Sequence, residues 1–252
     1  MKNIITITSL LFAGTLATNA AVTIWGQAPC NASGQNVASW DVSGNGLTWG
    51  ITNGQSVVFT IDYNTIDSNK SYALFSMKDI QYNGLAAVAI KDGNLIFENW
   101  NDSSATVSTS LSTISATKDL TFVLTRKPAS SANTTGVPII LSVYVDGKFD
   151  TAATTLTGKD KFFFSGKSWT KLNFGGTSEN AYTGNVNNVM PSNTNAAEFG
   201  LLGAGYTAGA QVTTDELKEY YASVVPEPSA FGLFAGLGAL ALVAARRRRS
   251  RK

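Results

Sequence analysis

The chain has 252 residues, with 19 Lys or Arg, 17 Asp or Glu, one cysteine and no histidine. The lack of histidine excludes Ser-His-Asp and Cys-His catalysis and the commonest zinc sites, and the single Cys30 cannot form an intramolecular disulfide. The net charge of +2 misrepresents the central part, because residues 21–224 hold 12 basic and 16 acidic residues. This acidic balance argues against a nucleic-acid partner.

The N-terminal residues have the pattern of a secretory signal peptide. Lys2 supplies a positive charge, residues 4–17 are apolar, and the small residues 18–20 precede a cut after Ala20. A buried N-terminal strand is the alternative. We expect residues 1–20 to be removed by signal peptidase and residues 21–224 to form one folded domain.

The central part has the pattern of an all-β protein. Residues 31–54 suggest short strands joined by turns, and residues 101–117, rich in Ser, Thr and Asn, suggest a loop or an edge hairpin. Asp92-Gly93 and Asp146-Gly147 are typical hairpin turns. The predicted strands are 55–63, 71–78, 85–91, 95–100, 119–126, 139–145, one starting at 148, 161–165 and 169–175. Their short spacing predicts an antiparallel β-sandwich.

One short helix is expected near residues 214–222. Thr213 and Glu216 form a capping box at its start, and Leu217, Tyr220 and Tyr221 then share one face at i, i+3 and i+4. We expect a helix of two to three turns that packs through this face.

The last 28 residues form a compact membrane-directed segment. Two prolines keep residues 225–229 out of a helix, residues 230–245 carry no charge, and residues 246–252 hold six cations. This pattern predicts a transmembrane helix followed by a stop-transfer signal at Arg246, Arg247, Arg248 and Arg249. The cationic end is expected on the cytoplasmic side.

The order of these parts resembles the PEP-CTERM sorting signal of Gram-negative bacteria, which exosortase recognises. Pro226, Glu227 and Pro228 match the motif. The resemblance implies that the chain is an exosortase substrate, anchored at least transiently in the inner membrane with a periplasmic core and a cytoplasmic C-terminus. Cleavage near the motif would pass it to the cell surface or extracellular matrix. The alternative is a permanently membrane-anchored structural protein.

The central part resembles the laminin-G-like, concanavalin A-type jelly roll. The matching segments are LTFVLTR, ILSVYVDGKFDTA, WTKLNFGG and TTDELKEYYAS. The resemblance implies a two-sheet jelly roll and, in many members, binding of glycans or protein ligands at a loop edge, sometimes with calcium.

The central part shows no catalytic pattern. The Glu-x-Asp-x-x-Glu strand of jelly-roll glycan hydrolases is missing, and the nearest carboxylates, Glu98 and Asp102, are four residues apart at a strand end. We interpret them as solvated loop residues; a secreted glycan-active hydrolase that uses unpaired carboxylates is the alternative. We expect no cofactor, although calcium could use oxygens from Asp92, Asn94, Asp146 and Asp150, which also suit turns.

Four tryptophans are candidates for stacking on sugar rings. They are Trp40, Trp49, Trp100 and Trp169. Each also suits a place in the core. The sequence therefore predicts an exported, non-enzymatic surface or matrix protein that binds a glycan, such as a polysaccharide, or another surface component.

Overall fold

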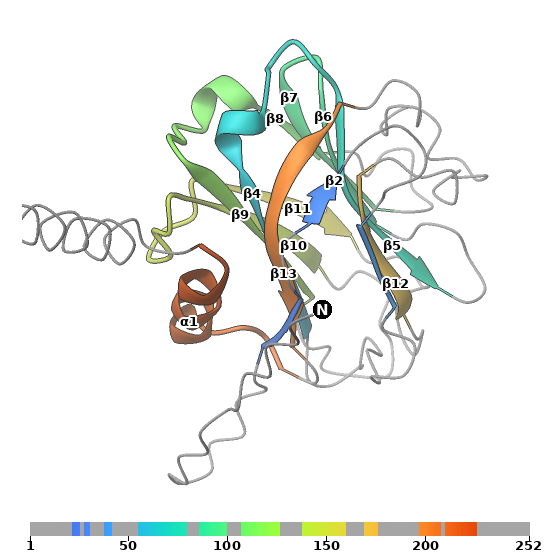
Figure 1. Ribbon diagram of the computed structural model, residues 1–252, viewed down its shortest axis with the longest axis vertical. Helices are drawn as coiled ribbons and strands as arrows, with labels where there is room; N and C mark the ends of the chain where they lie inside the picture. The colour runs from blue at the N-terminus through green and yellow to red at the C-terminus, as the bar shows by residue number, and fades with distance from the viewer. Residues whose placement is uncertain are drawn as a thin grey trace, which may run out of the picture.

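The computed structural model describes residues 22–25, 28–30, 38–41, 55–79, 86–99, 107–126, 138–159, 169–175, 197–207 and 210–225. Two antiparallel sheets face each other, and one α-helix lies beside them (Figure 1). The predicted all-β sandwich is confirmed. The predicted signal peptide and C-terminal transmembrane helix lie outside the described residues.

The first sheet has seven strands in the order β1-β13-β4-β9-β10-β11, with β2 also paired to β13. Its central strands β13, β4, β9 and β10 have eight residues each. Its strands are β1 (Thr23–Trp25), β2 (Ala28–Cys30), β4 (Gln55–Asp62), β9 (Asp119–Arg126), β10 (Pro138–Val145), β11 (Thr154–Lys159) and β13 (Phe199–Tyr206).

The second sheet has six strands in the order β3-β12-β5-β6-β7-β8. Its strands are β3 (Ala38–Asp41), β5 (Tyr72–Asp79), β6 (Ala86–Lys91), β7 (Asn94–Asn99), β8 (Val107–Ser110) and β12 (Trp169–Phe174). The helical elements are the 3-10 turns η1 (Tyr63–Thr65) and η2 (Leu111–Thr113) and the helix α1 (Thr214–Val224). Within the part of the chain that the structure describes, no helix is long and apolar enough to cross a membrane.

Most predicted strands are confirmed to within one residue of their ends. They are those expected at 55–63, 71–78, 85–91, 95–100, 119–126, 139–145 and 169–175. For residues 101–117 we expect a loop or an edge hairpin; the described part holds the single edge strand β8, which pairs with β7, followed by the turn η2. The strand expected at 161–165 lies outside the described residues.

Several features differ from the prediction, among them the short strands β1 and β2, which were not expected. The strand expected from Lys148 begins only at Thr154, because after an isolated bridge between Val145 and Lys148 the chain leaves the sheet and buries Phe149 against α1. The sequence analysis also missed β13, a central strand with the sequence FGLLGAGY. Its three glycines weaken the usual strand signal.

The main core lies between the sheets. Along β4, Val57, Phe59 and Ile61 point inward. The Phe59 ring stacks on Phe122 of β9, with ring centroids 4.7 Å apart, and on Phe75 of β5 at 5.1 Å. Each buried phenylalanine contributes about 1.5–3 kcal/mol to stability, so this aromatic cluster joins the two layers.

The helix α1 covers the outer face of the first sheet. Val58 and Val123 lie on that face and pack with Leu217, Tyr220 and Val224 of the helix in a second buried cluster. The capping box predicted at Thr213 is present, since its side chain accepts a hydrogen bond from the Glu216 amide and its own amide donates to the Glu216 carboxylate. The predicted helix is therefore confirmed, and it extends to Val224.

Both predicted Asp-Gly turns are tight two-residue hairpins with positive φ at both central residues. Asp92 and Gly93 have φ of 51° and 71°, and Asp146 and Gly147 have φ of 51° and 72°. The two glycines differ in surroundings. A Cβ on Gly93 would meet only the Ser68 carbonyl oxygen at 3.8 Å, whereas one on Gly147 would lie 2.6 Å from Cε1 of Tyr221.

Alanine at these two glycines separates backbone strain from packing. Gly93→Ala is expected to lower the free energy of unfolding by about 1–2 kcal/mol, the cost of a left-handed conformation with a Cβ. Gly147→Ala is expected to cost about 1–3 kcal/mol more, because the methyl group displaces the Tyr221 ring. Urea unfolding of both variants measures the difference, and equal losses would contradict the contact with α1.

Candidate functional site

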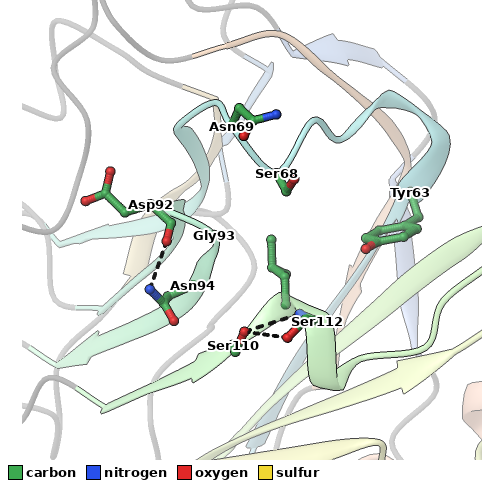
Figure 2. A pocket seen from close by; sticks show the side chains of 9 residues that line it. Tyr63, Ser68, Asn69, Asp92, Gly93, Asn94, Ser110 and Ser112 are labelled. Atoms are coloured by element: carbon green, nitrogen blue, oxygen red, sulfur yellow. Dashed lines mark hydrogen bonds between the residues drawn. The ribbon is translucent and has the colours of Figure 1, made fainter.

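A polar cleft lies at one end of the sandwich. Its volume is about 810 Å³, within the range of about 300–1,000 Å³ typical of ligand sites. Three connections form it: η1 with the loop that follows, the β6–β7 turn, and the junction of β8 with η2 (Figure 2). The lining residues are Tyr63, Ser68, Asn69, Asp92, Gly93, Asn94, Ser110, Leu111 and Ser112.

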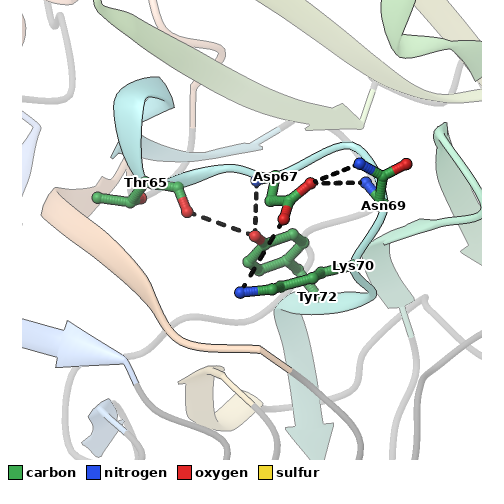
Figure 3. Close-up of polar contacts among 5 residues, drawn as sticks. All are labelled: Thr65, Asp67, Asn69, Lys70 and Tyr72. Atoms are coloured by element: carbon green, nitrogen blue, oxygen red, sulfur yellow. Dashed lines mark hydrogen bonds and ion pairs between the residues drawn. The ribbon is translucent and has the colours of Figure 1, made fainter.

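The first wall is held by a buried phenol. The Tyr72 side chain is fully buried, and its hydroxyl oxygen accepts a hydrogen bond from the Asp67 amide at 2.7 Å while donating to the Thr65 carbonyl at 3.4 Å (Figure 3). The Asp67 carboxylate in turn accepts from the Asn69 amide and side chain at 2.9 and 3.1 Å. These bonds fix the loop that carries Ser68 and Asn69.

The Asp67 carboxylate interacts with residues of its own loop. The hydrogen bond from the Asn69 backbone, together with its side chain and the neighbouring Lys70, holds the pKa of the Asp67 carboxyl below its usual value. Lys70 Nζ lies 4.0 Å from Asp67 Oδ2, so the lysine has its ionic partner on its own loop.

A backbone hydrogen bond joins the other two walls, and side-chain hydrogen bonds lie within each of them. The Leu111 amide donates to the Gly93 carbonyl at 2.9 Å. The Asn94 side chain donates to the Asp92 carbonyl at 3.0 Å, and the hydroxyls of Ser110 and Ser112 lie 2.8 Å apart (Figure 2). Leu111 is buried, and it supplies an apolar base beneath these polar groups.

The aromatic residue of the cleft is Tyr63, and its ring is partly buried against the main core. Sequence reasoning missed it, although Tyr63 is the last residue of the predicted strand 55–63, which placed an aromatic ring at a strand end. Of the four predicted tryptophans, none is among the described residues that line the cleft. Trp40 packs on Tyr206 with ring centroids 5.0 Å apart.

The other tryptophans and the sorting residues fall largely outside the described part of the chain. Trp169 begins β12, but its side chain is not described. Residues that lie wholly outside are Trp49, Trp100, Pro226, Glu227, Pro228, Arg246, Arg247, Arg248 and Arg249.

The proposed calcium oxygens do not come together. Asp92 lies in the β6–β7 turn and Asn94 begins β7, whereas Asp146 and Asp150 follow β10. Asp150 lies 3.7 Å from Lys218 Nζ. Among the described residues, no three acidic, histidine or cysteine side chains form a group that could hold a metal ion.

Asp146 uses its carboxylate to fasten the start of β9. It accepts hydrogen bonds from the Thr117 hydroxyl at 2.7 Å, the Lys118 amide at 2.8 Å and the Asp119 amide at 3.3 Å. Partial burial alone raises the pKa of Asp146, but these donors outweigh it and hold the pKa below its usual value.

Asp119 and two tyrosines fasten α1 to the sheet. The Tyr221 hydroxyl donates to Asp119 Oδ2 at 2.7 Å. The buried Tyr220 hydroxyl donates to the Gly203 carbonyl at 2.7 Å and accepts from Thr60 at 3.2 Å. Asp119 is 2% exposed, and its Oδ1 has no hydrogen-bond partner in the described structure. Burial therefore raises the pKa of Asp119, and that of Tyr220 as well.

Two neighbouring carboxylates with opposite pKa shifts are a pattern found in catalytic acid pairs. Here the geometry gives them a structural role. Asp119 is buried beneath Tyr221, and the oxygens of Asp146 are occupied by backbone and hydroxyl donors. Of the carboxylates weighed from the sequence, Glu98 lies in β7 with an undescribed side chain and Asp102 lies outside the described residues.

The end of α1 leads directly into the tail. Val224 is buried, and the Val225 amide donates to the Tyr221 carbonyl at 2.8 Å to close the helix. A family model for the PEP-CTERM protein-sorting motif matches residues 224–249. The chain carries a PEP-CTERM sorting motif. This motif begins within the last turn of a helix that is packed on the sandwich.

Comparison with solved structures finds receptor-binding domains of botulinum neurotoxins. A type C neurotoxin, whose cell entry is described as dependent on two ganglioside molecules, is 16% identical over 82% of this chain and 47% of that chain, with a TM-score of 0.47. The binding domain of neurotoxin DC in complex with SialylT is 15% identical over 83% and 48%, with a TM-score of 0.46.

The serotype D binding domain is 14% identical over 77% of this chain and 41% of that chain, with a TM-score of 0.43. The chain thus spans less than half the length of each of these domains. No curated protein matches the chain.

The opposite pKa shifts of Asp119 and Asp146 predict opposite effects of pH on the stability that each carboxylate contributes. A folded-state pKa raised above the unfolded value, as for Asp119, gives a contribution that is fully present below the unfolded pKa and is lost as pH rises through the folded pKa. Asp119→Asn removes this loss. Its stability relative to wild type should therefore improve between about pH 3 and pH 7, measured by urea unfolding.

Asp146→Asn is the matched control, because asparagine also tolerates positive φ. The lowered pKa of Asp146 gives stability that is present above the unfolded pKa and lost as pH falls through the folded pKa. The free energy of unfolding of Asp146→Asn should therefore fall relative to that of wild type as pH rises. The same sign of slope for both variants would contradict the assignment.

Proposed function

We propose that this chain is an exported, non-enzymatic surface protein that exosortase sorts through its C-terminal motif. The observation that carries the proposal is the match of the PEP-CTERM motif to residues 224–249, directly at the end of a docked helix. The cell surface or the extracellular matrix is the proposed destination. The delivered sandwich binds a glycan or another surface component there.

The proposed topology follows from the chain ends. Signal peptidase removes residues 1–20, residues 21–224 fold in the periplasm, and residues 230–245 span the inner membrane. Residues 246–252 stay in the cytoplasm because their cations resist transfer. Exosortase then recognises Pro226, Glu227 and Pro228.

The packed helix places the motif close to the folded domain. Val225 closes α1, so only residues 226–229 separate the domain from the proposed span. Five steps of extended chain cover at most about 18 Å. Before cleavage the sandwich therefore sits near the membrane surface, and the sorting enzyme meets the motif beside a folded domain.

Two observations support a binding role over an enzymatic one. The chain has no histidine for nucleophile activation. The pair with shifted pKa values, Asp119 and Asp146, is engaged in holding β9 and α1. In addition, the described surface carries an open polar cleft.

Intact-mass analysis of the protein recovered from cells tests the sorting proposal. Wild type is expected at the cell surface with a mass that lacks residues 1–20 and residues 246–252. Changing Pro226, Glu227 and Pro228 together to alanine should leave the full tail on protein held in the inner membrane. Glu219→Ala on the exposed face of α1 is the control and should be processed normally.

A surface form of the wild type that still carries residues 246–252 would contradict sorting and favour a permanent anchor. Normal processing of the triple alanine variant would contradict recognition of the Pro-Glu-Pro motif.

A further inference from the structure

We infer that the polar cleft between η1, the β6–β7 turn and the β8–η2 junction is a binding site for a neutral glycan. The inference rests on the proposed function, since it gives the delivered domain a defined site and a ligand class. It is carried by the charge of the cleft, by the arrangement of its hydrogen-bonding atoms and by the rigidity of its walls.

The charges at the cleft favour a neutral ligand. Asp92 is the single charged residue among the described lining residues, and its carboxylate points away from the centre of the cleft (Figure 2). Lys70, on the loop that also carries Ser68 and Asn69, has its Nζ 4.0 Å from Asp67 Oδ2. An anionic ligand therefore finds no lining cation to pair with, and a cation finds no converging carboxylates.

The two lining asparagines present oriented acceptors. Asn69 donates its side-chain amide to Asp67, and Asn94 donates its side-chain amide to the Asp92 carbonyl. Each bond fixes which end of the amide is the carbonyl. In the described structure neither carbonyl oxygen receives a hydrogen bond, so two acceptors of set orientation are available to sugar hydroxyls.

Hydroxyl groups and one aromatic ring complete the site. The Tyr63 hydroxyl points into the cleft (Figure 2), and neither it nor the Ser68 hydroxyl has a hydrogen-bond partner among the described residues. Ser110 and Ser112 add hydroxyls on the opposite wall. Hydroxyls act as donor and acceptor at once, as sugar hydroxyls do, and the Tyr63 ring offers an apolar face to a pyranose ring.

The walls of the cleft are held in place by hydrogen bonds within the protein, without a ligand. The buried Tyr72 hydroxyl holds the first wall through its hydrogen bond with the Asp67 amide. The backbone hydrogen bond from Leu111 to Gly93 joins the other two walls. A site with walls fixed in this way loses little conformational entropy on binding. Its volume of about 810 Å³ accommodates an oligosaccharide.

The test uses the purified full chain in a detergent without a sugar headgroup. Calorimetry measures binding of glucose hexasaccharides with α-1,4, β-1,4 and β-1,3 linkages and of galactose and mannose hexasaccharides, with a galacturonic acid hexasaccharide as the anionic comparison. At least one neutral hexasaccharide is expected to bind better than the anionic one, and addition of EDTA should leave its affinity unchanged.

Variants then locate the site. Tyr63→Ala should weaken binding by about tenfold or more, and Tyr63→Phe by less, because it keeps the ring. Ser68→Lys should abolish binding by filling the cleft, and its exposed position makes the change compatible with folding. Ser115→Lys is the matched control: Ser115 is exposed in the same region but does not line the cleft, so its affinity should equal that of wild type.

Four results would overturn the inference: no binding of any neutral hexasaccharide, preference for the anionic one, loss of binding in EDTA, or wild-type affinity in Ser68→Lys. The assay is independent of cleavage of the tail. Failure of binding with normal processing would therefore remove the glycan site alone, and failure of processing with intact binding would remove the sorting proposal alone.

Discussion

The central strands of the first sheet must bury both of their faces, and the rest of the structure follows from this requirement. On β4 and β9, Phe59 and Phe122 fill the space between the sheets, whereas Val58 and Val123 point outward. A strand with apolar residues on both faces needs a second cover, and α1 supplies it. Because the match to the PEP-CTERM motif begins in the last turn of α1, the packing of this helix also fixes where the motif leaves the domain.

The end of the sandwich that carries the cleft also carries Asp119 and Asp146, and polar groups have different roles in these two places. Around Asp146 and Asp119 the polar groups bond to one another. They hold together β9, the Asp146-Gly147 turn after β10, and α1. Around the cleft they are turned outward, while buried groups such as Tyr72 hold them in place. The carboxylates of Asp119 and Asp146 therefore serve the packing of α1 and β9, whereas the groups that line the open cleft are mainly uncharged hydroxyls and amides.

Much of the fold was predictable because its signals are local. The strand pattern at 119–126 located β9, Asp-Gly pairs located both tight turns, and Thr213 with Glu216 located α1. The central strand β13 was missed because Gly200, Gly203 and Gly205 carry no side chain to set a pattern. Its identity depends on pairing with β4 and β1, which are more than 100 residues away.

The sequence by itself determined the sorting motif and the class of fold, because a short linear signal and strand periodicity are properties of neighbouring residues. The tertiary structure alone decided the cleft and the docking of α1. Tyr63, Asn94 and Ser110 come from separate connections and meet only when η1, the β6–β7 turn and η2 reach the same end of the sandwich. Asp119 and Tyr221 are 102 residues apart and bond only across the face of the folded sheet.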